Sequence, residues 1–379
     1  MSEVIQDFLE SAKEFANTKI RPFAAEFEEK QQFPAQLIKE MGKAKFLGAT
    51  FPEKYNGMNL DPYNYGLLTE IIGKADCTAR SLLTVHTSLV GSAILRWGNE
   101  AQKNKWLPDM AEGNIITAFA LTEPNVGTDA SSIQTSYEEK ENAVIINGSK
   151  KWITFSGVAD YLLVIATNGK KVNAYMVDTK TPGVTIKPIK GLMAAKASYI
   201  SEIEFTNVEV PKENRIGVDG GGFAYIVSTA LDHGRYSIAW GGLAIAQEAL
   251  EAMVNYSRER KQFGKKIYTF QLIQEMIANA VANIHSTRAF LEKVASLRQQ
   301  NHQDSVNETI IAKYLTSKIA MQISTDAVQV HGGNGFYNKY PVERLFREAK
   351  VLEVIEGTSQ VLQNIISLYG LKKYYKINC

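Results

Sequence analysis

The chain has 379 residues, 45% hydrophobic and 22% charged, which supports two or three compact units and excludes a disordered or collagen-like protein. Lys and Arg number 42 against 40 for Asp and Glu, so the net charge of +2 gives no overall reason to expect a nucleic-acid partner. Two cysteines cannot form a disulfide framework, the acidic start is unlike a signal peptide, and no apolar run reaches the roughly 18 residues of a membrane span. We therefore expect a cytoplasmic protein with no membrane partner.

Residues 1–114 carry the apolar spacing of helices. Phe8, Ala12 and Phe15 lie three or four positions apart, which places them on one helix face. Further along, Asp61-Pro62 is typical of a helix start, with an N-cap followed by proline at the first helical position. We therefore expect an all-helical N-terminal domain over residues 1–114.

The pattern changes at Ile115. From there to residue 218, short runs rich in β-branched and aromatic residues are separated by turn residues. Asn147-Gly148 lies between two of these runs and is the strongest hairpin signal in the chain. We therefore expect a middle β domain over residues 115–218.

Helical spacing returns after the glycines at 220–222 and predicts a C-terminal helical domain over residues 219–379. The expected helical segments are 223–260, 271–299, 307–329 and 358–368. The order is helices, then strands, then helices, without alternation of strand and helix. This order disfavours a doubly wound dinucleotide fold and favours an α+β multidomain fold.

Several familiar sites are absent from the sequence. It contains no glycine-rich dinucleotide fingerprint, no P-loop and no HExxH motif, and its five histidines lack metal-ligand spacing. We therefore expect no metal site.

The segment 121–130 follows a predicted strand and is rich in polar groups. It offers the hydroxyls of Thr122 and Thr128, backbone N–H groups, and Gly127, where a ligand can approach the backbone closely. Such a loop can bind the polar edge of a planar cofactor or a phosphate. The same pattern is also typical of an ordinary turn capped by Asp129.

Two further segments permit cofactor binding and have plain structural alternatives. Trp152 follows the predicted hairpin, where an indole can cover one face of a flat ring, although tryptophan is also a common core residue. The segment 258–264 puts cations at a helix end, which suits a pyrophosphate and equally suits the helix dipole. The residues alone leave both interpretations open.

Glu356 is the candidate base. Apolar residues precede it, and Gly, Thr and Ser then open a helix. Desolvation raises the pKa of a carboxylate, as required of a base that removes a weakly acidic C–H proton. The alternative is an exposed glutamate near a helix start.

Taken together, these segments resemble the acyl-CoA dehydrogenase family over essentially the whole chain and in the family's domain order. The motifs that carry the resemblance are Thr122-Glu-Pro-Asn-Val-Gly-Thr-Asp129, Lys151-Trp-Ile-Thr154, Arg260-Lys-Gln-Phe-Gly264, Asp326-Ala-Val-Gln-Val-His-Gly-Gly-Asn-Gly335, Tyr340-Pro-Val-Glu-Arg344 and Glu356-Gly-Thr-Ser-Gln360. The resemblance implies a helical N-terminal domain, a barrel-like middle β domain and a C-terminal four-helix bundle, with FAD between the β domain and the bundle. It also implies a homotetramer arranged as a dimer of dimers.

The resemblance implies roles for individual residues. From one subunit, the FAD-binding residues would be Phe119, Leu121, Thr122, Gly127, Thr128, Trp152, Thr154, Thr358 and Gln360. A neighbouring subunit would add Arg260, Gln262, Phe263, Gln271, Gln329, Gly332 and Gly333. The acyl thioester would contact Thr128, Asp232, Arg235 and Gly357.

Glu356 matches the family's catalytic base, which removes the α proton of a thioester while a hydride passes from the β carbon to flavin N5. The Glu356 backbone N–H and a ribityl hydroxyl would polarise the thioester carbonyl. Some members carry the base on the helix that contains residues 231–235, where this chain has Gly234. The resemblance therefore leaves Glu356 as the only candidate.

Departures from the family pattern predict the substrate. Many CoA-using members carry arginine where this chain has Gln363 and within the segment that here reads Ala194-Ala-Lys-Ala-Ser198. Other stretches look most like a biosynthetic branch of polyketide, nonribosomal-peptide and antibiotic pathways, namely residues 65–70, 81–86 and 231–240. That branch acts on short groups on an acyl carrier protein, such as hydroxymalonyl, methoxymalonyl or aminomalonyl units. We therefore expect oxidation of a short hydroxy- or amino-acyl group on a carrier protein.

Two alternatives stay open beside this expectation. One is a catabolic short- or branched-chain acyl-CoA dehydrogenase, and the other is an inactive flavoprotein scaffold, against which Glu356, Arg260 and Trp152 argue. The electron acceptor would be an electron-transfer flavoprotein or oxygen. A basic patch for docking an acidic carrier protein is offered by Lys372, Lys373 and Lys376, although such a run is also typical of a solvated tail.

Overall fold

The computed structural model describes residues 3–375 and divides them into two compact units. The helical unit comprises residues 3–25, 62–77 and 235–375, and the sheet unit comprises residues 26–61 and 78–234. Lys376 of the lysine patch and Cys379 lie outside the described residues. Over residues 3–375, no helix combines the length and apolar character needed to span a membrane. The predicted domain boundaries near residues 114 and 218 stay predictions.

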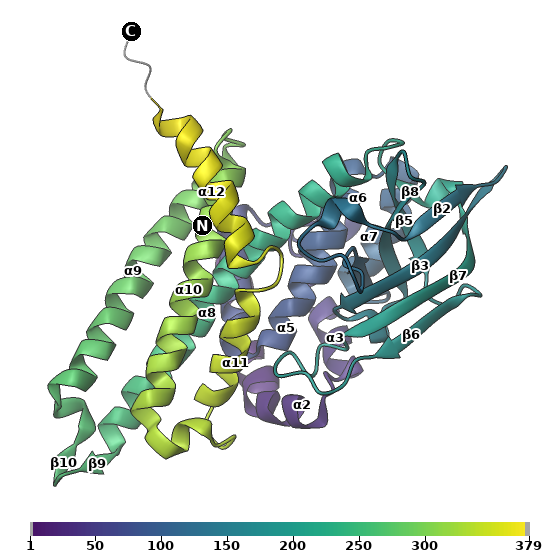
Figure 1. Cartoon of the computed structure of the whole chain (residues 1–379). Coiled ribbons are helices and arrows are strands. Elements are labelled where there is room, and N and C mark those ends of the chain that lie inside the picture. The colour runs from purple at the N-terminus through teal and green to yellow at the C-terminus, as the bar shows by residue number, and fades with distance from the viewer. Residues whose placement is uncertain (1–2, 376–379) are drawn as a thin grey trace. The chain divides into compact units, whose positions relative to one another are not determined.

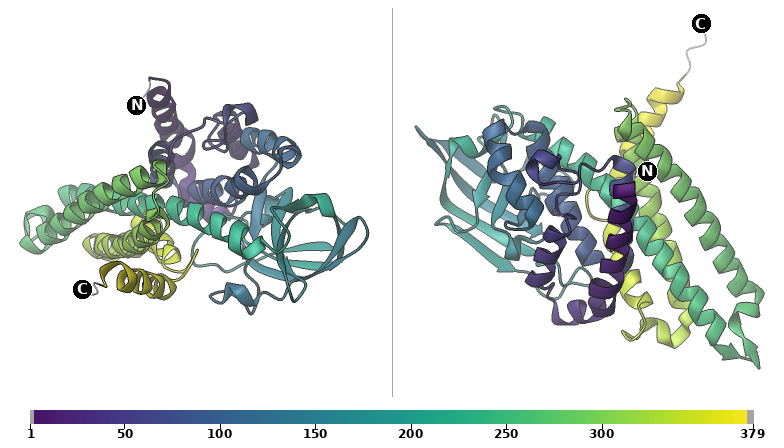
Figure 2. Two further views of the ribbon diagram at one scale, coloured as in Figure 1. Left: turned by 90° about the horizontal axis from the view of Figure 1, so that it is seen from above. Right: turned by 180° about the vertical axis from the view of Figure 1, so that it is seen from behind.

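The helical unit forms where the sequence has helical spacing. Its helices are α1 (Glu3–Phe15), α4 (Pro62–Ala75), α8 (Ser228–Glu259), α9 (Gln271–Gln299), α10 (Ser305–His331), α11 (Val342–Leu352) and α12 (Ser359–Tyr374). α4 begins at Pro62, as predicted, because proline has no N–H to lose at a first helical position. The long helices α9 and α10 run side by side in every view, with α12 against α10 (Figures 1 and 2).

Helices α8 and α10 approach each other closely at Gly242. A Cβ at this position would lie 2.8 Å from Cβ of Thr316 on α10, so only glycine fits without a shift of the backbone. The facing stretch of α10 is buried and mostly small or apolar, as at Ala312 and Ala320. Lys313 interrupts this stretch and is 0% exposed.

The sheet unit combines short helices with one curved sheet. Its helices are α2 (Ala24–Lys30), α3 (Ala35–Lys43), α5 (Cys77–Leu82), α6 (Ser92–Trp97) and α7 (Glu100–Glu112), with α2, α5 and α8 each containing a boundary between the units. α7 starts with a capping box in which Asn99 and Gln102 each accept a backbone N–H of the other at 2.9 Å.

The sheet is mostly antiparallel, and its strands follow the order β6-β7-β3-β2-β4-β5-β8, with β1 pairing β4 in parallel (Figure 1). The strands are β1 (Thr117–Ala120), β2 (Ser136–Glu139), β3 (Ala143–Ile153), β4 (Tyr161–Thr167), β5 (Val172–Asp178), β6 (Val184–Pro188), β7 (Ser201–Pro211) and β8 (Arg215–Ile216). The core of the unit lies under β4 and β5, whose central residues are buried without alternation. Because β1 pairs with the buried strand β4, the end of β1 and the loop that follows it are held in a fixed position.

The hairpin predicted at Asn147-Gly148 is wrong. Both residues lie inside β3, where a register shift against β7 marks a bulge. Gly148 has a φ of +140°, and a Cβ there would lie 2.7 Å from Cα of Thr135. Glycine at position 148 thus permits the backbone of Thr135 to approach β3 closely, which is a known reason for a glycine inside a strand.

Candidate active site and cofactor-binding residues

The loop after β1 is fastened to β3 by two consecutive lysines. The backbone N–H of Lys151 donates to Thr122 O at 2.9 Å, and Nζ of Lys150 donates to Leu121 O at 2.9 Å. Nζ of Lys150 also lies 2.8 Å from Oε1 of Glu123, inside the sheet unit. These bonds fix the start of the predicted cofactor loop relative to β3, the strand that contains Trp152.

The loop residues divide into anchors and an open face. Phe119 and Leu121 are buried, Thr122 is half-buried, and Gly127 and Thr128 are exposed. A Cβ at Gly127 would meet no atom within 4 Å, so space is open beside the backbone. The hydroxyl of Thr128 and the backbone at Gly127 are therefore accessible, and their binding to a cofactor stays a prediction.

Trp152 adopts an unusual backbone conformation. Its φ is +63°, at a second register shift of β3 against β7, and its side chain is 51% exposed. A bulky residue at positive φ is strained, and such strain is kept mostly at functional sites. The bulge turns a large indole outward, where it can cover a flat ring. Thr154, two residues later, is half-buried.

The turn between α11 and α12 carries Glu356. Glu356 has a φ of +53° and Gly357 a φ of +104°, so two successive residues are in left-handed or extended positive-φ conformations. The turn ends at Thr358, whose hydroxyl accepts the N–H of Val361 at 3.3 Å and caps α12. Gln360, in the first turn of that helix, is exposed.

Two cationic side chains hold the carbonyls of this turn. Nε of Arg235, on α8, donates to Glu356 O at 2.9 Å. Nζ of Lys313, on α10, donates to Gly357 O at 2.8 Å. Of the predicted substrate residues, the structure thus brings Arg235 and Gly357 to Glu356, the predicted base. Asp232 lies half-buried on the stretch of α8 that belongs to the sheet unit.

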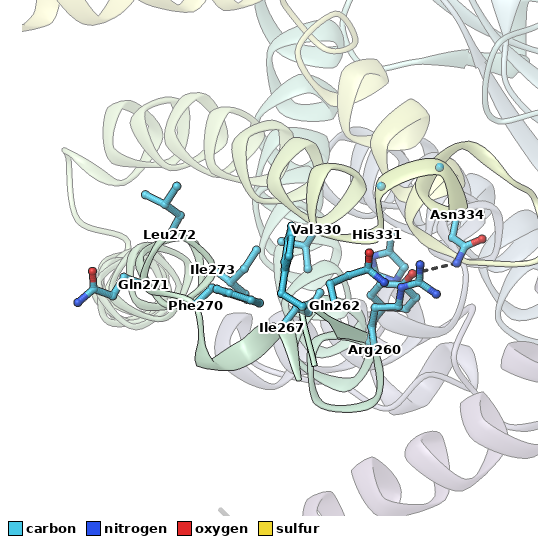
Figure 3. A pocket seen from close by; sticks show the side chains of 14 residues that line it. Arg260, Gln262, Ile267, Phe270, Gln271, Leu272, Ile273, Val330, His331 and Asn334 are labelled. Atoms are coloured by element: carbon cyan, nitrogen blue, oxygen red, sulfur yellow. Dashed lines mark hydrogen bonds between the residues drawn. The ribbon is translucent and has the colours of Figure 1, made fainter. Parts of the chain in front are cut away.

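A third group of predicted residues lines one pocket of the helical unit (Figure 3). We call it the hairpin pocket because it lies beside the hairpin of β9 (Lys261–Gln262) and β10 (Lys265–Lys266). It has a volume of about 750 Å³. The predicted residues among its lining are Arg260, Gln262, Phe263, Gln271, Gly332 and Gly333.

Aromatic rings close one end of the hairpin pocket. The ring of His331 stacks on Tyr256 with centroids 4.1 Å apart, and Nδ2 of Asn334 donates to the Tyr256 hydroxyl at 2.9 Å (Figure 3). Burial lowers the pKa of His331 below its usual value. A neutral stacked ring and one nearby guanidinium, that of Arg260, suit a ligand with a flat base and a phosphate.

Of the residues predicted to act from a neighbouring subunit, Gln329 is the one that the pocket lining does not include. It is exposed in the last turn of α10, and its carbonyl accepts the N–H of Gly332. The hairpin of β9 and β10 lies at one end of the helical unit, away from the segment between α11 and α12 (Figure 1). One chain therefore does not bring all predicted residues of this unit together.

These residues fit FAD. The hairpin pocket combines a cation, aromatic walls and the backbone of Gly332, where a Cβ would meet no atom within 4 Å. Its volume is in the range of small-molecule sites, which is about 300–1,000 Å³. The exposed indole of Trp152 and the open loop at Gly127 suit a flat ring with a polar edge.

Sequence reasoning missed three features of the site. The buried pair of Lys150 and Glu123, the bond from Lys313, and the stacked ring of Tyr256 were not singled out. For Lys313 a signal existed, because it lies four residues after Thr309 and three before Thr316 on the buried face of α10. A lysine in a buried stripe indicates a specific polar partner.

Comparison with known proteins identifies the class. The models of the N-terminal, middle and C-terminal domains of acyl-CoA dehydrogenases match residues 2–114, 118–208 and 220–368. The chain is 38% identical over 367 residues to an acyl-CoA dehydrogenase of Bacillus subtilis (strain 168), covering 95% of this chain and 96% of that protein. It is also 38% identical over 360 residues to a short-chain specific acyl-CoA dehydrogenase of Clostridium acetobutylicum, covering 94% of each.

Solved structures agree over the whole length. Butyryl-CoA dehydrogenase from Megasphaera elsdenii is 36% identical with a TM-score of 0.94, and the match covers 98% of this chain and 99% of that one. A chain in the structure of the electron-transferring flavoprotein of Acidaminococcus fermentans is 38% identical with a TM-score of 0.95, covering 98% and 99%. The prolyl acyl carrier protein oxidase AnaB is 26% identical with a TM-score of 0.91, covering 97% and 99%.

The fold and these matches define an FAD-dependent oxidoreductase, and the chain belongs to the acyl-CoA dehydrogenase family. The predictions of family, fold and cofactor are confirmed. The narrower prediction of a carrier-protein branch in polyketide or antibiotic biosynthesis is not supported, because the similar curated proteins include short-chain specific acyl-CoA dehydrogenases.

Proposed function

We propose that this protein is a short-chain acyl-CoA dehydrogenase in which Glu356 is the catalytic base. The observation that carries the proposal is the Glu356 turn, which is held at both carbonyls and has a strained backbone. The similarity to short-chain specific relatives supports the substrate class. This is the catabolic alternative, and it replaces the carrier-protein substrate as the main reading.

In the proposed reaction the carboxylate of Glu356 accepts the α proton of the acyl thioester. Bound FAD supplies the two-electron acceptor for the hydride that leaves the β carbon. The Glu356 backbone N–H donates to the thioester carbonyl and stabilises the negative charge that develops there. Thr122, Thr128 and Trp152 would hold and cover the flavin. The partner that would accept the electrons is an electron-transfer flavoprotein, a role supported by the match to a chain from such a system.

We further propose that the hairpin pocket serves a second copy of the chain, within a dimer of dimers. Phe263 lies at the tip of the hairpin with a φ of +51° and an exposure of 93%, and Leu272 is 72% exposed. Large apolar groups at such exposure beside a cationic pocket indicate a surface that another molecule covers. Arg260 would then bind the pyrophosphate of the FAD held by its neighbour.

A carrier-protein substrate remains the second candidate function. The match to a prolyl acyl carrier protein oxidase favours it, and so do two positions where many CoA users carry arginine. Gln363 is neutral and donates to the Tyr314 hydroxyl at 2.9 Å, and Lys196 lies 3.9 Å from Glu28. Less cationic charge is then free for the phosphates of CoA.

Anaerobic flavin bleaching tests the two candidates. The purified yellow enzyme is mixed with butyryl-CoA or with the same acyl group on an acyl carrier protein, at about 0.05 and 0.5 M salt, which shortens the screening length roughly threefold. We expect faster bleaching by butyryl-CoA. Bleaching by the carrier-protein thioester alone, slowed by salt, would establish the second candidate. Failure of both thioesters to bleach the flavin would favour the inactive scaffold.

A further inference from the structure

The turn that carries Glu356 does not hold its shape through local preferences. Glu356 has a φ of +53°, and a side chain larger than hydrogen makes this region unfavourable. Gly357 follows at +104°, where a Cβ would lie 3.1 Å from Leu362. Strained backbone of this kind persists only where the surroundings over-determine it.

The surroundings are two cations from different helices that bond successive carbonyls. Arg235 donates from α8 to Glu356 O, and Lys313 donates from α10 to Gly357 O. The close approach of α8 and α10 at Gly242 sets the spacing of the helices from which both side chains reach the turn. Glu356 O belongs to the peptide that follows Glu356, and Gly357 O to the next one, so the two bonds fix the peptide planes on either side of Gly357.

Burying a lysine for one carbonyl is costly. The Lys313 side chain is completely buried, and burial lowers its pKa to about 8, although the charges of Glu356 and Glu353 oppose that shift. An apolar side chain of similar length would fill the same space without desolvating an ammonium. The positive charge of Lys313 is therefore better explained by its interaction with the Glu356 turn than by packing of the side chain.

We propose that Lys313 is a positioning residue for the base: its ammonium fixes the carbonyl of Gly357, holds the turn in its strained form, and favours the ionised carboxylate of Glu356. The charged groups around Lys313 are Glu356 and Glu353 from the α11–α12 segment and Arg235 from α8. Nothing in the family motifs quoted above contains this residue. The inference rests on the proposed function, because it requires Glu356 to be the base.

The test compares Lys313→Met, Lys313→Gln and the control Lys318→Met in the FAD-loaded enzyme. Methionine removes both charge and hydrogen bond, and glutamine removes the charge but keeps a donor. Lys318 is an exposed lysine on the same helix. For each protein, FAD content, thermal unfolding and the rate of flavin reduction by butyryl-CoA are measured as functions of pH.

We expect all three variants to retain FAD. Loss of the positive charge destabilises the carboxylate, so the acid limb of the rate profile should move to higher pH by about 0.5–1 unit in both Lys313 variants. Lys313→Met should also slow reduction about tenfold at the plateau, because the turn loses a bond, whereas Lys313→Gln should slow it less. Lys318→Met should match the wild type in rate and profile.

An unmoved acid limb in Lys313→Gln would overturn the proposal, and this variant decides the matter even where Lys313→Met does not fold. A purely structural lysine would change the melting temperature without moving the limb. Glu356→Gln is measured alongside. If that variant is reduced as fast as the wild type, the proposed function fails, whatever the Lys313 profiles show.

Discussion

Nζ of Lys150 and Oε1 of Glu123 form an ion pair at 2.8 Å in which both side chains are almost completely buried. The pair joins β3, the strand that contains Trp152, to the loop that contains Thr122, and both segments belong to the predicted flavin site. Burial alone would raise the pKa of Glu123, but Lys150 together with donors from Thr135 and Gln134 brings the pKa below its usual value. The ionised carboxylate of Glu123 thus links the loop after β1 to Lys150 of β3 and to the backbone at Gln134 and Thr135.

Lys150→Met should destabilise the fold strongly. The change leaves the Glu123 carboxylate buried without its cation, which typically costs about 3–5 kcal/mol. Urea unfolding measures this loss, and adding Glu123→Gln should recover a large part of it. A loss below about 1 kcal/mol would contradict the pairing. Because the folded pKa of Glu123 is depressed, its contribution is present above the unfolded value and should fade as pH falls below about 4.5.

Trp152→Gly should weaken FAD binding while leaving the fold intact. Glycine relieves the strain at a φ of +63°, and the indole that it removes is half-exposed, so the free energy of unfolding of the apoprotein should stay within about 1 kcal/mol of wild type. FAD titration by fluorescence checks the binding. Phe155→Gly is the matched control, because Phe155 also has a positive φ but its side chain is buried. Loss of the Phe155 ring should lower the free energy of unfolding by more than about 3 kcal/mol. Unchanged FAD affinity in Trp152→Gly would remove the indole from the site.

Arg260→Ala should cause loss of FAD and should also weaken the oligomer. The reason is that the pyrophosphate loses a charge-assisted hydrogen-bond partner at a site that two subunits share. Lys266→Ala, at an exposed lysine of the same hairpin, should keep both. Absorbance at the flavin band and sedimentation velocity measure the two effects. A stable monomer that still binds FAD would exclude the proposal that neighbouring subunits share the cofactor site.

Glu356→Gln should keep FAD and the fold yet lose reduction by substrate, because the amide fills the same space but cannot accept the proton. Anaerobic stopped-flow absorbance with butyryl-CoA measures the rate. A residual rate close to wild type would show that the base lies elsewhere. Adding Gly234→Glu to this variant then asks whether the alternative position on α8 can supply one.

Local sequence pattern predicted much of the architecture. Helical spacing predicted α9 at 271–299, where the structure has Gln271–Gln299, and Pro62 was predicted as a helix start. Local sequence pattern failed where the pairing of distant segments determines the structure. Asn147-Gly148 has the composition of a hairpin turn, but β7 and β2 on its two sides keep it within β3. The hydrogen bonds of a sheet outweigh a turn preference spanning two residues.

The sequence by itself determined which residues are available for chemistry: a carboxylate at Glu356 preceded by apolar residues, an arginine at a helix end and a tryptophan among the predicted strands. Only the tertiary structure decided which groups hold them in place. Lys150 meets Glu123, and Lys313 meets Gly357 44 residues further along the chain. Spacing along a chain reports the face on which a side chain lies, whereas a buried charge finds its partner through packing between elements, which no local pattern encodes.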